Sequence, residues 1–344
     1  MRIGIVCDQP AMTARLRGAV VQAPEHQVTW TATSSREAVD RCGSHAPDLV
    51  LVVVPSAGID GTDATQRIMG TTPCAILLVT MDGGAHGGPI FEAMGHGALD
   101  VVDLPALGSG APQRSAALLQ KKLTTIARVI RDRNGTRTPL RNAHKTASAR
   151  CDRLIAIGAS AGGPAALAVI LAAVPKDFPA AIVIVQHVDA KFTAGMTEWL
   201  TSQTGLCVRV AQEGDRLVRG SVFMAGTSNH LILKGKDRLA YTPEPLDYLY
   251  KPSVDVFFES VCRKWQYEAV GVLLTGIGKD GARGLKLLRD RGHHTIAQDE
   301  ATSSVYGMPK AAVALDAAVD ILPIRRIARR LIDLMDKHGK TTTP

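Results

Sequence analysis

The sequence predicts an α/β protein: a doubly wound domain of five strand–helix units, followed by a larger doubly wound domain with a mainly parallel sheet. Short apolar runs alternate with amphipathic segments along most of the 344 residues, which is typical of parallel α/β sheets. Hydrophobic residues make up 46% of the chain and charged residues 21%, a composition that supports about two globular cores. A basic stretch without apolar periodicity separates the two halves.

The amino-terminal domain is predicted to cover residues 1–131. Its apolar runs recur about every 20–25 residues, which is the length of one strand–helix unit. A helical period of apolar side chains over residues 113–130 predicts the last helix of this domain. The five predicted strands are residues 3–6, 28–31, 49–54, 75–79 and 99–102.

Residues 132–150 are predicted to form a basic linker. Arginine and lysine outnumber aspartate in this segment, and no apolar period continues through it. Two interpretations stay open, namely a solvated tether or a docking segment for an acidic surface.

The carboxyl-terminal domain is predicted to cover residues 151–344. It opens with an apolar strand that begins at Leu154, and β-branched residues dominate the next strand, residues 180–185, as a buried parallel strand requires. Further predicted strands are residues 208–211, 221–224, 231–233, 238–241, 270–274 and 295–297. The predicted helices are residues 166–173, 193–204, 253–264, 282–291, 309–314 and 323–338.

The turn after the first strand of this domain carries the most informative motif. Residues 158–162 have the form G-x-S-x-G, with Ser160 at the bend between a strand and a helix. Such a turn presents a serine hydroxyl at the carboxyl end of a parallel strand, where the free N–H groups of the helix face it. Taken alone, the motif leaves open a nucleophile, a phosphate cradle or a plain tight turn.

Two further polar residues follow predicted strands of the same domain. His187 comes after residues 180–185, and Asp280 comes after residues 270–274 in a glycine-rich loop. Because the carboxyl ends of parallel strands meet at one edge of a sheet, we expect Ser160, His187 and Asp280 to lie together. His187 would then take the proton of Ser160, and Asp280 would orient and stabilise the imidazolium. The polar loops 248–253 and 298–309 are predicted to wall this site.

Composition argues against several classes of protein. The net charge of +8 does not indicate a nucleic-acid partner, because aromatic residues make up only 4% of the chain, and we favour an acidic protein partner. The six cysteines form no C-x-x-C pair and the remaining histidines lack metal-ligand spacing, so no metal is predicted. Neither a signal peptide nor an apolar run of ~20 residues is found, so we expect a cytoplasmic protein without membrane insertion.

Five separated blocks of the second domain together resemble the bacterial chemotaxis methylesterase family, CheB. The blocks are residues 158–163, 186–187, 251–255, 274–282 and 297–309. This resemblance implies hydrolysis of γ-glutamyl methyl esters on the cytoplasmic helices of methyl-accepting chemoreceptors, with release of methanol. It also implies deamidation of receptor glutamines, and it implies no cofactor.

The resemblance assigns a role to each site residue. Ser160 matches the family nucleophile, His187 its general base and Asp280 its orienting acid. Backbone at His187 and at Ile277 matches the family's oxyanion donors. Ile277 stands where the family usually has methionine, and Ala161 stands where it usually has threonine, so substrate positioning is the least specified feature.

The first domain resembles a response-regulator receiver but lacks residues that phosphoryl transfer requires. Asp8 and Thr80 are retained. Leu51 stands at the aligned position of the phospho-accepting aspartate, and Leu104 replaces the lysine. Because the carboxylate nucleophile is missing and the metal pocket is depleted, we predict a pseudo-receiver that a partner switches. A chemotaxis-type histidine kinase or an array component is the partner that the resemblance implies.

Residues 90–103 are most similar to the methylesterases of Wsp-type surface-sensing pathways.

Two other functions stay open at this point. A catalytically silent adaptor would hold a receptor array together, although Ser160, His187 and Asp280 argue against it. A nucleotide-binding α/β domain would use the glycines around Ser160, but no P-loop lysine follows them and no G-x-G-x-x-G is formed.

Overall fold

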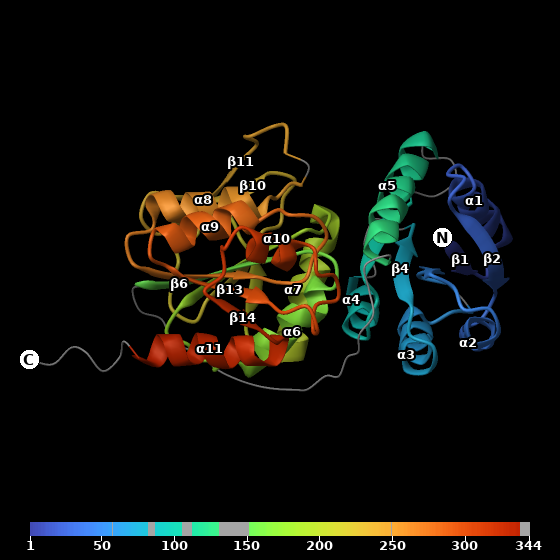
Figure 1. Ribbon diagram of the computed structural model, residues 1–344, viewed down its shortest axis with the longest axis horizontal. Helices are drawn as coiled ribbons and strands as arrows, with labels where there is room; N and C mark the ends of the chain where they lie inside the picture. The colour runs from blue at the N-terminus through green and yellow to red at the C-terminus, as the bar shows by residue number, and fades with distance from the viewer. Residues whose placement is uncertain (57, 82–86, 105–111, 131–150, 249, 338–344) are drawn as a thin grey trace, which may run out of the picture. The chain divides into compact units, whose positions relative to one another are not determined.

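The computed structural model describes residues 1–344 except 57, 82–86, 105–111, 131–150, 249 and 338–344. The chain divides into two compact units, Met1–Asn134 and Gly135–Pro344 (Figure 1). The predicted linker, residues 132–150, lies outside the described residues, so its boundaries stay a prediction. Among the described helices, none combines the length and the apolar character that crossing a bilayer needs.

The first unit contains the predicted five-stranded parallel sheet, in the order β2-β1-β3-β4-β5. Every residue of the central strand β3 is buried, which explains its uninterrupted apolar sequence. The elements of this unit are β1 (Arg2–Val6), α1 (Pro10–Val20), β2 (Gln27–Ala32), α2 (Ser35–Ser44), β3 (Leu49–Val53), α3 (Gly61–Thr71), β4 (Ala75–Thr80), α4 (Gly87–Gly95), β5 (Asp100–Asp103) and α5 (Pro112–Ile130).

Strand β3 corrects one assignment made from the sequence. Leu51 is the middle residue of this strand, where it pairs with Ile5 on one side and Leu77 on the other and is fully buried. A phospho-accepting residue has to stand at the carboxyl end of the strand, and Val53 ends β3. The assignment of Leu51 to that position is therefore wrong by two residues, and the residue that ends the strand also lacks a carboxylate.

The second unit contains a seven-stranded sheet in the order β14-β13-β12-β6-β7-β9-β8, in which all described pairs are parallel. The strands β10 and β11 form a separate antiparallel hairpin. The elements are β6 (Arg153–Ala159), α6 (Gly163–Ala173), β7 (Ala181–Gln186), α7 (Ala190–Thr204), β8 (Val208–Val210), β9 (Val222–Met224), β10 (His230–Lys234), β11 (Arg238–Thr242), α8 (Val254–Lys264), β12 (Glu268–Leu273), α9 (Ala282–Asp290), β13 (His294–Gln298), α10 (Met308–Ala314), β14 (Asp320–Leu322) and α11 (Ile324–Lys337).

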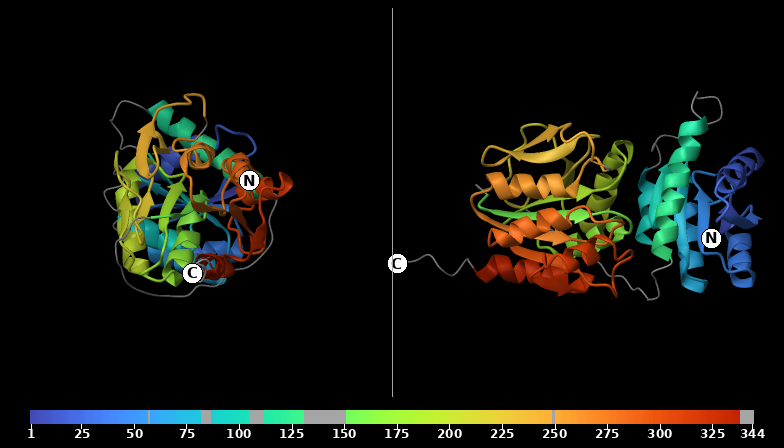
Figure 2. Two further views of the ribbon diagram at one scale, coloured as in Figure 1. Left: turned by 90° about the vertical axis from the view of Figure 1, so that its left-hand side faces the viewer. Right: turned by 45° about the horizontal axis from the view of Figure 1, so that its top comes forward.

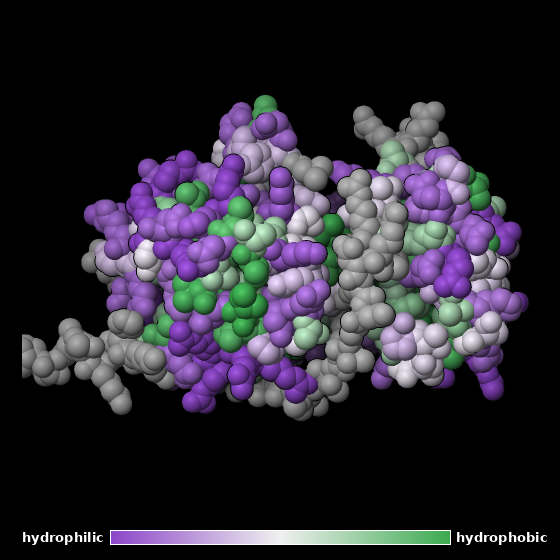
Figure 3. Space-filling view, in the orientation of Figure 1, coloured by the Kyte–Doolittle hydropathy of each residue, from purple (hydrophilic) through white to green (hydrophobic). Residues whose placement is uncertain are grey.

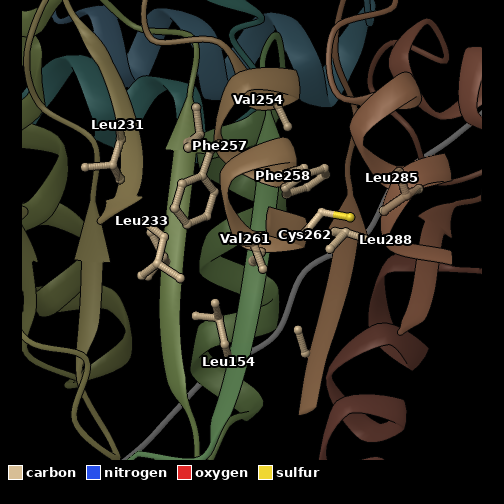
Figure 4. Packing of buried hydrophobic residues seen from close by; sticks show 14 of the residues in the cluster. Leu154, Leu231, Leu233, Val254, Phe257, Phe258, Val261, Cys262, Leu285 and Leu288 are labelled. Atoms are coloured by element: carbon tan, nitrogen blue, oxygen red, sulfur yellow. The ribbon is translucent and has the colours of Figure 1, made fainter. Parts of the chain in front are cut away.

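Helices cover both faces of the seven-stranded sheet. Helices α8 and α9 pack together on one face, and α6 and α11 pack together on the other (Figures 1 and 2). Figure 4 shows how α8 meets the sheet through buried Val254, Phe257 and Phe258. A Cβ at Gly158 would come within 2.2 Å of Cγ1 of Val254, so this glycine lets the start of α8 approach the end of β6 closely. The amino terminus of α8 is thereby brought to the carboxyl edge of the sheet.

Strand β14 was not predicted from the sequence. It has three residues at one edge of the sheet, too few for an alternating pattern to be recognised. Ile321 in this strand is 48% exposed, and Val319 and Leu315 before it are each 49% exposed. Figure 3 shows apolar side chains on this face of the unit.

Candidate active site

Ser160, His187 and Asp280 follow three neighbouring strands of the seven-stranded sheet. Ser160 comes directly after β6, His187 directly after β7, and Asp280 in the loop after β12. Strand β6 lies between the other two, and the chain leaves it toward β7 and later returns to β12 on the opposite side. Open α/β sheets bind ligands where the strand order reverses in this way. The structure therefore places all three predicted residues at the edge that the sequence indicated.

Ser160 lies in the turn between β6 and α6, and its neighbours fix the turn. The N–H of Ser160 donates to the carbonyl of Thr275 over 3.0 Å, and its carbonyl accepts from the side-chain amide of Gln186 over 2.8 Å. Gly162 has a φ of 73°, and a Cβ there would come 2.1 Å from Cβ of Ser304. The glycine requirement of the motif thus comes from the left-handed turn and from close packing around a serine that is 7% exposed.

His187 and Asp280 form a buried hydrogen-bonded pair. Nε2 of His187 lies 2.7 Å from Oδ2 of Asp280, and the two side chains are 6% and 8% exposed. Nδ1 of His187 is buried and has no hydrogen-bond partner within the part of the chain that the structure describes. Because a neutral imidazole carries one proton, donation from Nε2 to Asp280 leaves Nδ1 as the basic nitrogen.

The ends of β6 and β7 place Ser160 beside His187. Ala159 and Gln186 are register partners, so Ser160 and His187 are the next residues along two adjacent strands. Between these two described residues the structure records no hydrogen bond from Oγ to the ring. Contacts between catalytic groups often tighten only when substrate binds. The fold therefore brings the hydroxyl and the imidazole to adjacent positions without joining them.

The carboxylate of Asp280 caps the amino terminus of α8. It accepts hydrogen bonds from Oγ of Ser253 at 2.8 Å, from the N–H of Val254 at 2.7 Å and from the N–H of Asp255 at 3.1 Å. Free N–H groups at the start of a helix favour a negative charge. Burial acts to raise the pKa of Asp280, but hydrogen bonds from His187 and Ser253 outweigh it, so the pKa is lowered. Asp280 is therefore ionised and fixed in place when His187 takes up a proton.

The loop after β12 lies against the serine and offers one backbone donor. A Cβ at Gly276 would come 2.7 Å from Cβ of Ser160. The N–H of the next residue, Ile277, has no acceptor among the described residues. The N–H of His187, in contrast, donates to the carbonyl of Ala159 over 3.0 Å. The prediction that the His187 backbone supports an oxyanion is therefore wrong, because its N–H already continues the β6–β7 ladder.

The sequence assigned no individual role to two residues at the site, Tyr250 and Gln186, although Tyr250 lies in the loop 248–253 that was predicted to wall it. The ring of Tyr250 stacks on His187, with centroids 4.1 Å apart and planes 7° from parallel. Gln186 is buried and donates to the carbonyls of both Ser160 and His187. Their only sequence signals are an aromatic residue in a polar loop and a glutamine before a strand-end histidine. The loop 298–309 also lies against the site, since Gln298 accepts from the N–H of Thr275 at 2.9 Å.

The corresponding edge of the first unit has different contacts. The carboxylate of Asp8 accepts from Oγ of Ser56 and from the N–H of Gly58, the latter over 2.8 Å. Leu104 follows β5 and donates its N–H to the carbonyl of Thr80 over 2.7 Å. In both units, the described residues include no group of three or more histidine, cysteine, aspartate or glutamate side chains that could hold a metal ion.

Comparison with known proteins shows where the chain belongs. Residues 155–331 match the CheB methylesterase family. A protein-glutamate methylesterase/protein-glutamine glutaminase of Pseudomonas fluorescens (strain Pf0-1) is 52% identical over 337 residues, covering 98% of this chain and 100% of the relative. A protein with the same activities in its name, from Pseudomonas aeruginosa, is 51% identical over 336 residues, with the same two coverages.

A solved structure resembles the second unit. The CheB methylesterase catalytic domain of Thermotoga maritima is 33% identical to this chain, with a TM-score of 0.51, and covers 54% of this chain and 100% of that domain. The family match and the relatives that align with nearly the whole chain together show the family. This chain belongs to the CheB methylesterase family.

Proposed function

We propose that this chain is a protein-glutamate methylesterase and protein-glutamine glutaminase that uses Ser160 as its nucleophile. The observation that carries the proposal is the buried hydrogen bond of 2.7 Å between His187 and Asp280, at the strand end beside Ser160. Both activities stand in the names of relatives that align with nearly the whole chain. A catalytically silent adaptor would have no need of a base held by an ionised carboxylate.

The first half of the reaction is transfer of the glutamyl acyl group to the enzyme. Oγ of Ser160 attacks the ester carbonyl carbon while Nδ1 of His187 takes its proton. The negatively charged oxygen of the tetrahedral intermediate accepts a hydrogen bond from the N–H of Ile277, and Asp280 stabilises the imidazolium. The bond to the methoxy group then breaks, His187 returns the proton to that oxygen, and methanol leaves.

The second half regenerates the serine. A water molecule attacks the acyl carbon while His187 takes its proton, and the proton then passes to Oγ of Ser160 as the ester bond to the enzyme breaks. The products are a glutamate carboxylate and the free serine. A glutamine substrate follows the same steps with ammonia as the leaving group, so one set of residues serves both activities.

We infer that the substrates are cytoplasmic helices of methyl-accepting chemoreceptors and that the chain acts in the cytoplasm. The net charge of +8 favours association with an acidic protein surface. Lys279, next to Asp280, is exposed and adds positive charge beside the site. A chemotaxis-type histidine kinase or array component is the proposed partner, and the similarity of residues 90–103 favours a Wsp-type surface-sensing pathway.

A nucleotide is a poor fit for the same turn. In P-loops, glycines leave room for phosphate oxygens next to the backbone. Here the side chain of Ser304 fills the space beside Gly162, and that of Gln186 fills the space beside Gly163. Thermal stabilisation by ATP or NAD would support the nucleotide alternative, and we expect none.

We propose that the first unit is a pseudo-receiver that a partner protein, rather than phosphate, switches. Three features support this: Val53 ends the third strand, Leu104 replaces the lysine, and Asp8 is already hydrogen-bonded by Ser56. Incubation with a small phosphodonor such as acetyl phosphate should label no aspartate of residues 1–131. Stoichiometric labelling of any aspartate there would overturn the proposal.

Methanol release from a methylated receptor signalling fragment tests the catalytic proposal directly. The Ser160→Ala variant of the full chain should lose at least about 10⁴-fold in kcat, because no nucleophile remains to form the acyl intermediate. Ser202→Ala is a matched control that should leave kcat unchanged, since Ser202 lies near the end of α7 and its Oγ donates to the carbonyl of Trp199. Equal release by the native chain and the Ser160→Ala variant would remove the mechanism.

A further inference from the structure

His230 is a fully buried histidine that the proposed mechanism does not use. It is the first residue of β10, in the hairpin that is separate from the seven-stranded sheet. Its Nδ1 lies 3.1 Å from the N–H of Ser253, and its Nε2 lies 3.1 Å from the carbonyl of Pro245. An amide N–H can only donate and a carbonyl can only accept, so the two contacts fix a neutral ring with its proton on Nε2.

Ser253 connects this ring to the site. Its backbone N–H donates to His230, while its Oγ donates to Oδ1 of Asp280 over 2.8 Å. Asp280 in turn holds Nε2 of His187 through its other oxygen. A continuous series of hydrogen bonds therefore leads from the β10–β11 hairpin, through the first residue before α8, to the ring that takes the serine proton.

The second contact of His230, with the carbonyl of Pro245, holds the loop whose Tyr250 stacks on the ring of His187. Pro245 precedes Tyr248, whose ring meets His230 edge-on, with centroids 5.9 Å apart and an angle of 82°. Two residues further along this loop, Tyr250 stacks on His187. His230 thus contacts both segments that hold His187, one through Asp280 and one through Tyr250.

We propose that His230 is a positioning residue, which holds Ser253 so that Asp280 presents its carboxylate to His187. This inference rests on the proposed function, since it assigns a role to His230 through the proposed base. It requires the neutral ring, because a proton on Nδ1 would face the N–H of Ser253 and break that hydrogen bond.

The surroundings of His230 favour the neutral form. Burial lowers the pKa of His230, and the positive charge of Lys251 lowers it further. The hydrogen bond to the carbonyl of Pro245 and the charge of Asp280 act in the opposite direction, but the net shift is downward.

Two substitutions separate the two contacts of the ring. His230→Asn places a carbonyl oxygen at the position of Nδ1, which can accept from Ser253, whereas His230→Gln places an amide N–H at the position of Nε2, which can donate to Pro245. Both variants lose one buried hydrogen bond, so a merely structural role predicts similar losses of melting temperature and of kcat for the two. A positioning role through Ser253 predicts that kcat falls about tenfold in His230→Gln and less than about threefold in His230→Asn, with KM within about twofold in both.

The His187–Asp280 hydrogen bond gives a readout that needs no turnover. In the native chain we expect a strongly downfield proton resonance from Nε2–H of His187, which His230→Asn keeps and His230→Gln loses. ¹⁵N shifts of the native chain should also show the proton of His230 on Nε2. Equal kcat values for the two variants, or a His230 proton on Nδ1, would overturn the proposal.

The native chain supplies the test if neither variant folds. On lowering the pH, the His187 resonance should disappear as His230 gains a proton, and a resonance that persists with His230 protonated would overturn the proposal. Failure of the proposed function would show itself differently. In that case Ser160→Ala would release methanol at the native rate, while the spectra of His230 and His187 would stay as described.

Discussion

The two units share a doubly wound architecture but differ at the carboxyl edges of their sheets. In the second unit, strand ends carry Ser160 and His187, and a helix start holds Asp280 against the imidazole. In the first unit, the third strand ends in Val53, and Ser56 and Gly58 occupy the oxygens of Asp8. The architecture supplies a carboxyl edge in both units, and the side chains at the strand ends differ between the two edges.

The two carboxylates make the difference concrete. Asp8 and Asp280 each accept a backbone N–H and a serine hydroxyl. Asp280 also meets a ring nitrogen, His187 Nε2, and the other nitrogen of that ring remains basic. A hydrogen-bonded carboxylate is therefore common to both units, and Asp280 is the one that lies against the ring of His187, which the proposed mechanism uses as its base.

The largest expected difference between the units comes from removing these two charges. Asp280→Asn should lower kcat for methanol release by about 10³–10⁴-fold, because an amide does not stabilise the imidazolium and can force the wrong tautomer of His187. Asp8→Asn keeps an oxygen acceptor in the first unit and should leave kcat within about twofold. Both are measured in the full chain with the same methylated receptor fragment, and a comparable loss in Asp8→Asn would break the comparison.

A smaller effect is expected from crowding the catalytic edge. A Cβ at Gly276 would meet Sδ of Met308 at 2.2 Å and Cβ of Ser160 at 2.7 Å. Gly276→Ala should therefore displace the serine turn and lower kcat about 10–100-fold, with a loss of about 1–3 kcal/mol in the free energy of unfolding.

Gly18 in the first unit provides the matched control. It lies in α1, is exposed, and would bring a Cβ within 4 Å of nothing. Gly18→Ala should leave kcat unchanged and raise the free energy of unfolding by about 0.5–1 kcal/mol, because alanine favours a helix. Methanol-release kinetics and urea denaturation check both variants. Unchanged kcat in Gly276→Ala would show that the turn tolerates displacement.

The sequence predicted the two sheets well because uninterrupted apolar runs identify buried parallel strands. The prediction from sequence failed where the apolar pattern does not mark the end of a strand or is too short to be recognised. The apolar run that contains β3 continues into Val54, so the sequence shows neither where the strand ends nor which residue stands at its end, and the pairing with β1 and β4 shows that Leu51 lies in the middle. Strand β14 is too short for any period to be seen.

The same distinction holds for the site. Residues that follow strand ends could be predicted, whereas residues that are positioned by packing between distant elements could not. Ser160, His187 and Asp280 could be predicted because each follows a strand that ends at the same edge. The contacts of Ser253 and His230 depend on how α8 and the β10–β11 hairpin pack, and no spacing in the sequence records that. The same holds for the N–H of His187, whose use in the ladder follows from register alone.

The smallest expected effect concerns stability and sharpens the comparison of carboxylates. Burial, with a contribution from the charge of Asp280, raises the pKa of Asp255 to about 6 from an ordinary value of 3.8. The contribution of Asp255 to stability is therefore fully present below about pH 3.8 and is lost as the pH rises through about 6. Asp48, in the first unit, has a lowered pKa: burial acts to raise it, but hydrogen bonds from Arg2 prevail. The contribution of Asp48 to stability is therefore present above the pKa that it has in the unfolded chain, and it is lost as the pH falls through the lowered pKa of the folded protein.

Because the pKa values of Asp255 and Asp48 are shifted in opposite directions, replacing each aspartate by asparagine should change the free energy of unfolding in opposite directions at high pH. In the native chain, Oδ1 of Asp255 accepts from the N–H of Gly284 over 2.7 Å. Asp255→Asn keeps an oxygen that can accept this hydrogen bond, and it removes the repulsion between the charges of Asp255 and Asp280. At about pH 7.5 it should raise the free energy of unfolding by about 1 kcal/mol after allowance for solvent screening, and at about pH 4 it should change little. Asp48→Asn should lower stability at the higher pH. Urea denaturation of both variants at the two pH values measures these changes in the free energy of unfolding. If both variants were stabilised, or both destabilised, at about pH 7.5, the predicted difference between the two carboxylates would be wrong.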